Sequence, residues 1–556
     1  MSSITHDRAT RDVVAGRTIF EYADELSVEV PTSCQRKGSC HECVVEIRCG
    51  MAALSPPNEA ESFLRGDFRL ACQAKVIVTT EDIEFAALRR RPKILTASAP
   101  KDNEPVDSAV REHAGKVFYA DEEIGKFRGH LYGLAVDLGT TTIAMELIDL
   151  RTGQGEGTCS FENPQRFGGS DVMHRISYDG VEGAGELQRA VCAAINREIL
   201  VFCRDLDFSR HEIYEITIAG NTTMRDILFK IDVQTVGQKP YKSLVESEVD
   251  AGTRSGTALI ELARKLGLLA NPRARIYGLP LVSCHVGGDL AAGLIALDIS
   301  PDGDDTVMLV DMGTNTEVFL RHQGRMIVAS CPAGPAFEGG LVKYGMPAYD
   351  GAIEKLRIVT DSAGDTDVQF ETIGGDTPQG LCGSGLIDLL AELRRNNLMT
   401  AKGVFTADKR QFEYLLLPQH GITFSKEDAS NLGQAKAANY CGQLIIMRTL
   451  GVDPGDIATL YLAGGFAHHV DISSAANIGL LAPVPEERIV RAGNTSLRGA
   501  REVLLSAKKR NALEEMVRRI EHIELETTTD FFELFVDGCQ FKPMPDRLNS
   551  APGRLN

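Results

Sequence analysis

The chain has 556 residues, enough for roughly three or four domains, and 43% hydrophobic residues from which to build their cores. Its formal net charge of -18 argues against a general nucleic-acid binder, because contacts to phosphates need a basic surface. No apolar run reaches the length of a membrane span, and thirteen cysteines without a recognisable signal peptide favour a reducing cytoplasm over a disulfide framework.

The first predicted domain, residues 1–95, begins with short β-rich segments. Apolar residues alternate with polar ones over parts of residues 12–30, and a second apolar segment lies at residues 44–47. A further strand is expected within residues 67–78. Strands of this length would frame a loop rather than build a large core.

The loop between these strands carries cysteines in the spacing C-x5-C-x2-C, with a fourth on the last strand: Cys34, Cys40, Cys43 and Cys72. This spacing is one residue from the plant-type pattern, in which four thiolates hold a [2Fe-2S] cluster. Gly38 would let the loop backbone curl around inorganic sulfide. A structural zinc site is the alternative, although a second compact pair of ligands is missing. Cys49 is expected to be a bystander.

Residues 96–129 are predicted to be a linker that tethers this domain. They contain Pro100 and Pro105 and show little sustained periodicity, with room for a short helix. From residue 131 onward, apolar strands and helices alternate, which predicts an α/β fold. We divide this remainder into a middle part, residues 130–206, and a C-terminal part, residues 207–556.

A strand, an aspartate and a tight Gly-Thr turn occur twice, at residues 133–142 and 307–316. The turn exposes backbone N–H groups to phosphate oxygens, the threonines add donors, and the aspartates would position hydrated Mg²⁺ and water. One such turn also fits an ordinary hairpin, whereas two copies with matched flanks are a much stronger signal. The residues expected at the phosphates and the metal are Asp137, Gly139, Thr140, Thr141, Thr142, Asp311, Gly313, Thr314 and Asn315.

Two further glycine loops complete the predicted nucleotide site. Gly464 and Gly465 end an apolar strand and would let a purine nucleoside lie against the backbone. Gly383, Ser384 and Gly385 open an amphipathic helix whose N-terminal amides would favour an anion. Either loop alone fits a helix cap or a packing point equally well. Since a Walker A sequence does not occur, the site is predicted to be of the actin, Hsp70 and sugar-kinase type.

The order of ferredoxin module, linker and actin-like ATPase resembles the reductive activators of corrinoid-dependent enzymes, over nearly the whole chain. Longer motifs carry the resemblance more specifically than the Gly-Thr turns do, and they lie at residues 163–168, 219–224, 334–340 and 351–354. One departure is His41-Glu42, where the family often has Gly-Lys. This change leaves the cluster ligands intact but alters the charge beside them.

The resemblance implies a β-grasp ferredoxin domain of the α+β class, followed by a two-lobed ATPase of the actin-like (ASKHA) class. It implies an ATP-hydrolysing oxidoreductase that reduces an inactive Co(II) corrinoid to Co(I) through its [2Fe-2S] cluster, with ATP and Mg²⁺ as cofactors. The partner would be a corrinoid methyltransferase or corrinoid protein, and a homodimer is left open. Because the chain has no evident flavin or nicotinamide motif, the electrons would come from an external low-potential donor.

Other functions stay open at this stage. The chain could be a small-molecule kinase whose cluster only senses redox state, and it would then consume ATP with a free sugar or acid. It could also be an electron carrier for an oxygenase, in which case ATP would not affect reduction. Glu338 and Glu354 are further polar candidates near the site, whereas His468 and His469 are expected to have surface or capping roles.

Overall fold

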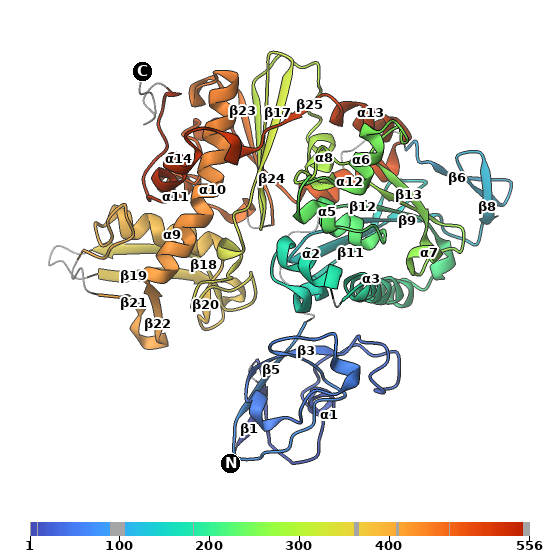
Figure 1. Cartoon of the computed structure of the whole chain (residues 1–556), viewed down its shortest axis with the longest axis horizontal. Helices are drawn as coiled ribbons and strands as arrows, with labels where there is room; N and C mark the ends of the chain where they lie inside the picture. The colour runs from blue at the N-terminus through green and yellow to red at the C-terminus, as the bar shows by residue number, and fades with distance from the viewer. Residues whose placement is uncertain are drawn as a thin grey trace.

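The computed structural model describes residues 2–7, 9–88, 106–181, 183–360, 366–406, 411–465 and 467–548. Following the chain, it shows an N-terminal domain, a middle lobe and a C-terminal lobe, with the N-terminal domain lying below the middle lobe in Figure 1. Within the described ranges, no helix combines the length and the apolar character that a membrane crossing requires.

The N-terminal domain is a small mixed sheet packed against one helix. Its sheet has the order β2-β1-β5-β3-β4, in which β1 runs parallel to β5. The strands are β1 (Ser3–His6), β2 (Ala9–Asp12), β3 (Val44–Cys49), β4 (Phe68–Leu70) and β5 (Ile83–Ala87). This arrangement confirms the predicted α+β ferredoxin domain. The helix, α1 (Ile19–Glu25), lies where we expected strand, because Thr18 and Glu21 form a capping box that starts it.

The middle lobe is built on the sheet β11-β10-β9-β12-β14-β13. Its strands are β9 (Tyr132–Leu138), β10 (Thr142–Asp149), β11 (Gly155–Glu162), β12 (Ile213–Ala219), β13 (Leu259–Leu262) and β14 (Arg275–Gly278). Its helices are α2 (Val172–Val181), α3 (Glu186–Asp205), α4 (Thr222–Leu228), α5 (Gln234–Gly237), α6 (Leu244–Asp250), α7 (Ala263–Leu266) and α8 (Gly288–Ala296). The boundary expected between residues 206 and 207 is wrong, because β9 and β12 are hydrogen-bonded neighbours in one sheet.

The C-terminal lobe repeats this plan in the sheet β24-β23-β15-β16-β17-β25. Its strands are β15 (Val307–Met312), β16 (Thr316–His322), β17 (Arg325–Cys331), β23 (Thr459–Ala463), β24 (Ile489–Gly493) and β25 (Ile520–His522). In each lobe the first strands form an antiparallel meander, and a later strand pairs parallel to the first one. The motif duplication seen in the sequence is therefore a duplication of topology.

Smaller elements complete the C-terminal lobe. A side sheet contains β18 (Ala352–Thr360), β19 (Thr366–Thr372) and β20 (Gly380–Leu381), and a hairpin contains β21 (Glu413–Leu417) and β22 (Ile422–Ser425). The helices are α9 (Gly383–Arg395), α10 (Lys426–Leu450), α11 (Ile472–Asn477), α12 (Thr495–Leu505), α13 (Ala507–Val517) and α14 (Phe531–Gly538).

Of these helices, α12 and α13 lie between β24 and β25 in the chain but pack on the middle lobe, where Figure 1 shows α12 beside α8. Thr217 of β12 donates a hydrogen bond to the backbone oxygen of Ala500 in α12, at 2.9 Å. Arg510 of α13 donates to the buried carboxylate of Glu215, at 2.7 Å. The chain thus crosses between the lobes more than once.

The predicted linker is partly a folded element. Residues 96–105 lie outside the described residues, but β6 (Val110–His113), β7 (Lys116–Tyr119) and β8 (Glu122–Lys126) form an antiparallel sheet. In the described part of this segment, residues 106–129, strands take the place of the short helix that we allowed for. Val110, Val117 and Ile124 are buried on one face of this sheet, and Tyr214 of the middle lobe donates to the Lys126 backbone oxygen.

A buried ion pair stabilises the N-terminal domain. Arg69 donates to both carboxylate oxygens of Glu61, at 2.8 and 3.0 Å, and both side chains are almost fully buried. Glu61→Gln would leave the Arg69 cation without a counter-charge, which costs about 3–5 kcal/mol in other proteins. We expect the first thermal unfolding transition in scanning calorimetry to fall by at least ~10 °C.

The matched control is Glu25→Gln, because Glu25 pairs with Arg17 on the exposed surface of the same domain. This variant should leave the transition almost unchanged. Equal transitions for the wild-type chain and Glu61→Gln would show that the buried pair contributes no stability.

Candidate nucleotide and cluster sites

A cavity of about 680 Å³ lies between the middle and C-terminal lobes, within the usual size of a ligand pocket. The predicted residues that line it are Asp137, Gly139, Thr140, Thr141, Thr142, Asp311, Gly313, Thr314, Asn315, Gly383, Ser384, Gly464 and Gly465. Gly385 does not line the cavity. A Cβ atom there would lie 2.2 Å from the Ile353 backbone oxygen, so this glycine lets α9 pack closely against β18.

The two Gly-Thr turns face each other across this cavity because each joins the first two strands of its lobe. Asp137 lies near the end of β9, opposite Ala144 of β10, and Asp311 lies near the end of β15, opposite Glu317 of β16. Gly464 ends β23 with a φ of +111°, and a Cβ atom there would lie 2.1 Å from the Met312 backbone oxygen. Glycine is therefore required where β23 approaches the second turn.

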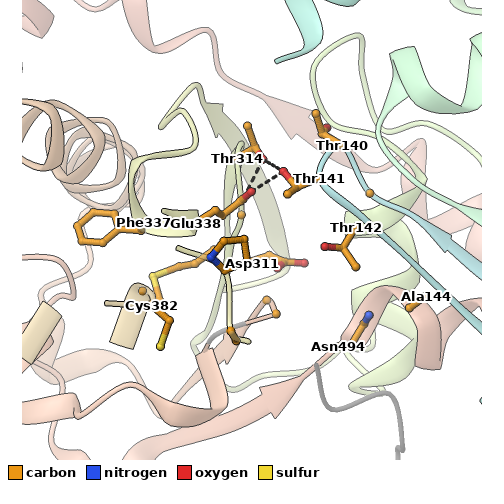
Figure 2. Close-up of a pocket in the computed structure, with 18 of the residues that line it drawn as sticks. Thr140, Thr141, Thr142, Ala144, Asp311, Thr314, Phe337, Glu338, Cys382 and Asn494 are labelled. Atoms are coloured by element: carbon orange, nitrogen blue, oxygen red, sulfur yellow. Dashed lines mark hydrogen bonds between the residues drawn. The ribbon is translucent and has the colours of Figure 1, made fainter. Parts of the chain in front are cut away.

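One carboxylate joins the two turns, and Figure 2 shows the contact between the labelled side chains. Thr141 and Thr314 donate to the two oxygens of Glu338, at 2.5 and 2.8 Å, and their own hydroxyl oxygens lie 3.0 Å apart. Burial raises the pKa of Glu338, while the donated hydrogen bonds from the threonines oppose this shift. The hydroxyls predicted to bind phosphate, one from each lobe, thus both donate to one carboxylate.

Further buried carboxyl groups surround the cavity. Burial, with a smaller contribution from the nearby Asp289, raises the pKa values of both Asp137 and Asp311 to about 7. Burial also raises the pKa values of Asp289 and Glu317. Several carboxyl groups in one buried cavity repel each other when ionised, so a cation bound among them would relieve this cost. Carboxylate oxygens suit Mg²⁺, which usually keeps several of its waters.

Sequence reasoning missed several lining residues. Asp289 follows a glycine pair at the start of α8, a pattern like the one used for Gly464, and Glu317 follows the second turn. Asn494 caps α12 and donates to Asp137, at 2.8 Å. Asn221 caps α4 and donates to Thr140, at 2.9 Å. An asparagine before a helix predicts a cap, but the sequence does not indicate that its side chain also contacts the cavity.

The remaining polar candidates lie at the same cavity. Glu354 lines it, and His469 lies 3.5 Å from the Glu354 carboxylate with about half of its side chain exposed. His469 is exposed, as expected, and it lies at the rim of the cavity. The side chain of His468 lies outside the described residues.

The predicted cluster cysteines converge at one end of the N-terminal domain. Cys43 donates to the Cys72 sulfur, at 3.4 Å, and the Thr32 hydroxyl lies 3.9 and 4.0 Å from the sulfurs of Cys34 and Cys40. The thiols therefore form two neighbouring pairs, as expected where each of two irons takes two thiolates. Among the described residues, no group of three or more His, Cys, Asp and Glu side chains is arranged to hold a single metal ion.

The loop backbone also fits a cluster. Gly38 has a φ of +80°, and a Cβ atom there would lie 2.9 Å from the Gln73 side chain. Backbone amides of residues 37, 39 and 40 hydrogen-bond to Cys34, so the loop presents donors to sulfur. Cys49 lies exposed at the end of β3, away from these pairs.

Three protein-family models match the chain. The model described as "2Fe-2S iron-sulfur cluster binding domain" matches residues 4–76. The model "RACo middle region" matches residues 132–302, and "C-terminal domain of RACo the ASKHA domain" matches residues 305–550.

Characterised proteins and a solved structure are similar over most of the chain. The "Corrinoid activation enzyme RamQ" of Eubacterium limosum is 28% identical over 435 residues, covering 74% of this chain and 70% of the relative. The "[Co(II) methylated amine-specific corrinoid protein] reductase" of Methanosarcina barkeri is 26% identical over 431 residues, covering 73% and 76%. The structure titled "Reductive activator for corrinoid,iron-sulfur protein" has a TM-score of 0.70 and 25% identity, covering 99% of this chain and 100% of the other. The chain therefore belongs to the family of reductive activators of corrinoid proteins, which join a [2Fe-2S] ferredoxin domain to a middle region and an ASKHA domain.

Proposed function

We propose that this protein reduces the inactive Co(II) state of a corrinoid protein or corrinoid methyltransferase to Co(I), with ATP hydrolysis driving the transfer. The observation that carries the proposal is the joining of two sites in one chain. Four cysteines converge in the ferredoxin domain, and paired Gly-Thr turns face each other in the interlobe cavity. The names of the similar proteins, which specify corrinoid activation and Co(II) reduction, support the same function.

The energetics explain why such a protein would need ATP. Plant-type [2Fe-2S] clusters have potentials near about -400 mV, and Co(I) is a stronger reductant. Since 59 mV corresponds to a tenfold change in a one-electron equilibrium, a deficit of ~100 mV costs ~2.3 kcal/mol. Nucleotide binding that favours one state of the protein and its corrinoid partner can supply a free energy of this size.

Each group of residues has a distinct proposed role. When bound, the cluster supplies a one-electron carrier, which Cys34, Cys40, Cys43 and Cys72 hold. Asp137 and Asp311 position Mg²⁺ and the attacking water, and the hydroxyls of the two turns hold the phosphates. The glycines at 464 and 465 lie against the nucleoside, and Ser384 adds a donor at the start of α9.

The other participants follow from the same chemistry. The electron comes from a separate low-potential protein of the cytoplasm, since no flavin or nicotinamide motif is evident in the chain. The proposed transfer needs one copy of the chain and is compatible with a homodimer.

The aspartates of the two turns should control ATP hydrolysis. Asp137→Asn and Asp311→Asn each remove a charge that would hold Mg²⁺, so ATP turnover should fall at least ~10²-fold, the usual effect of losing one preorganised electrostatic contact. A phosphate-release assay measures this, and the visible spectrum should not change. Asp121→Asn is the control, because Asp121 lies exposed on the β6–β8 sheet beside Arg111. Normal turnover in both turn variants would contradict the assigned roles.

The cysteines should control the cluster independently of ATP hydrolysis. Replacing Cys34, Cys40, Cys43 or Cys72 singly by Ser should remove the visible absorption and the paramagnetic signal of the reduced protein, because each thiolate holds an iron. Cys49→Ser is the matched control and should keep both signals. A colourless, zinc-containing wild-type protein, made without oxygen and with sufficient iron, would show that the thiols hold zinc instead.

The complete reaction tests the proposed function directly. With a low-potential donor and a corrinoid protein from the same cell, the wild-type chain should convert the Co(II) spectrum to that of Co(I) only when ATP and Mg²⁺ are present. Cysteine variants should hydrolyse ATP without reducing cobalt, and Asp137→Asn should accept electrons without passing them on. Cobalt reduction at the same rate without nucleotide would leave a simple ferredoxin. ATP consumption that requires a free sugar or acid would indicate a kinase.

A further inference from the structure

The ferredoxin domain contacts the middle lobe through a few polar and aromatic side chains. Arg166 donates to the carboxylate of Glu46, at 3.2 Å, and His41 lies 3.1 Å from the carboxylate of Glu186 at the start of α3. Tyr178 of α2 donates to the backbone oxygen of Phe63, at 2.5 Å. Figure 1 shows the domain beneath α2 and α3. Arg197 of α3 also pairs with Glu29, and Phe63 and Phe167 are buried at this contact.

The docked side of the ferredoxin domain is the one beside the cluster loop. His41 lies between the ligands Cys40 and Cys43 in sequence, and its ring stacks on Phe63 with a centroid distance of 4.2 Å. The Phe63 ring in turn contacts Phe167 of the middle lobe edge to face, at 5.8 Å. A corrinoid partner that approaches the cluster from this side needs the domain to leave the middle lobe.

The segment of the middle lobe that contains Arg166 and Phe167 also contacts the first Gly-Thr turn. Asn163 is fully buried, and its side chain donates to the Gly139 backbone oxygen, at 2.8 Å. Its backbone N–H donates to the Thr141 backbone oxygen, also at 2.8 Å. Residues 163–167, which we name the coupling segment, therefore bind the nucleotide turn at one end and the ferredoxin domain at the other.

A third contact connects the coupling segment to the C-terminal lobe. Tyr349 of that lobe donates a short hydrogen bond to Glu162, and Arg166 donates to the same carboxylate, at 3.3 Å. Arg166 is thus shared between Glu162 and Glu46 of the ferredoxin domain. If Tyr349 withdraws, Glu162 loses a donor and can bind Arg166 more strongly, at the expense of Glu46.

Phosphate binding would disturb this arrangement from the other side of the cavity. Thr141 and Thr314 contact each other directly, at 3.0 Å, with Glu338 against both hydroxyls. Both hydroxyls already donate to Glu338, so a phosphate group that takes them as donors competes with this carboxylate, and we expect the turns to separate as it binds. This separation would move the lobe that carries Tyr349.

We infer that the coupling segment links nucleotide binding in the interlobe cavity to release of the ferredoxin domain from the middle lobe. This inference rests on the proposed function, because it takes ATP as the ligand of the cavity. Release exposes the His41 side of the cluster loop to a corrinoid partner. Because coupling between two binding events is reciprocal, weakening the docked state should strengthen nucleotide binding, by at most the coupling factor.

Nucleotide affinity therefore reports on docking, and Glu46→Arg is the variant of choice. Glu46 does not line the cavity, and its reversal places two cations at the Arg166 contact. By titration calorimetry of the full chain with Mg²⁺ and a non-hydrolysable ATP analogue, we expect Glu46→Arg to bind about fivefold more tightly than wild type, at the low end of usual coupling factors. The double variant Glu46→Arg, Arg166→Glu restores opposite charges and should return the affinity toward the wild-type value.

Glu25→Arg is the matched control, since it makes the same charge change on the same domain at a residue paired with Arg17 of that domain. It should bind the analogue as wild type does. An equal gain in Glu25→Arg, or equal affinities in all variants, would overturn the inference while leaving the proposed function intact. A wild-type chain that binds no analogue would contradict the proposed function as well.

Hydrogen exchange measures the release itself. In wild type, the analogue should increase amide exchange in residues 41–48 and 59–68, which lie at the docked side. Glu46→Arg should show the higher exchange without the analogue. If the analogue binds wild type and exchange in these segments stays constant, the ferredoxin domain does not respond to the nucleotide and the inference fails.

Discussion

The arrangement of the interlobe site depends on one contact, in which the hydroxyls of two threonines donate to one half-buried carboxylate. Thr141 comes from the middle lobe, Thr314 from the C-terminal lobe, and Glu338 accepts from both. A half-buried carboxylate is costly unless donors reach it, and this need holds the two turns together. A phosphate group needs the same donors. The threonines can therefore serve Glu338 in one state of the protein and a nucleotide in another.

The acidic residues around this contact would favour a cation beside the proposed nucleotide. Asp137, Asp289 and Asp311 come from different elements, and each raises the cost of ionising its neighbours. The pKa values near 7 of Asp137 and Asp311 mean that protons compete for these oxygens at physiological pH. A divalent cation would replace those protons and also neutralise phosphate charge, so the proposed metal and nucleotide would favour each other's binding.

The crossing of α12 and α13 onto the middle lobe makes that lobe a single rigid support for the site. Arg510 and Thr217 fix these helices to the central sheet, and Asn494 at the start of α12 reaches Asp137. The first turn is thus held by Asn494 on one side and by Asn163 on the other. Asn163 belongs to the coupling segment, so in our inference a movement of this turn displaces that segment and, through Arg166, weakens the contact with the ferredoxin domain.

Local sequence features predicted residues that the fold brings together at the interlobe cavity and in the ferredoxin domain, and the classes of the folds. Cysteine spacing and Gly-Thr turns can be recognised in a sequence because each depends on a few adjacent residues. Those residues supply both the backbone conformation and the hydrogen-bond donors of the motif. The linker prediction failed for residues 110–126, which form three strands. Their turns place Ala114 and Ala120 at positive φ, and alanine is not a residue that marks such turns in a sequence. Helix α1 was missed because its capping box lies within a segment that also alternates like a strand.

Other features were decided by the tertiary structure, since they join residues that are distant in the chain. Asp289, Glu317 and Asn494 reach the cavity because separate strands and helices end at the same cleft, which no local pattern reveals. The pairing of Arg166 with Glu46 depends on how one domain lies against another. The sequence by itself determined which chemistry the chain carries, because ligand types and turn geometry are local. The tertiary structure decided which charged residues pair and which domains contact each other, because burial and the distances between remote residues are set only when the chain packs.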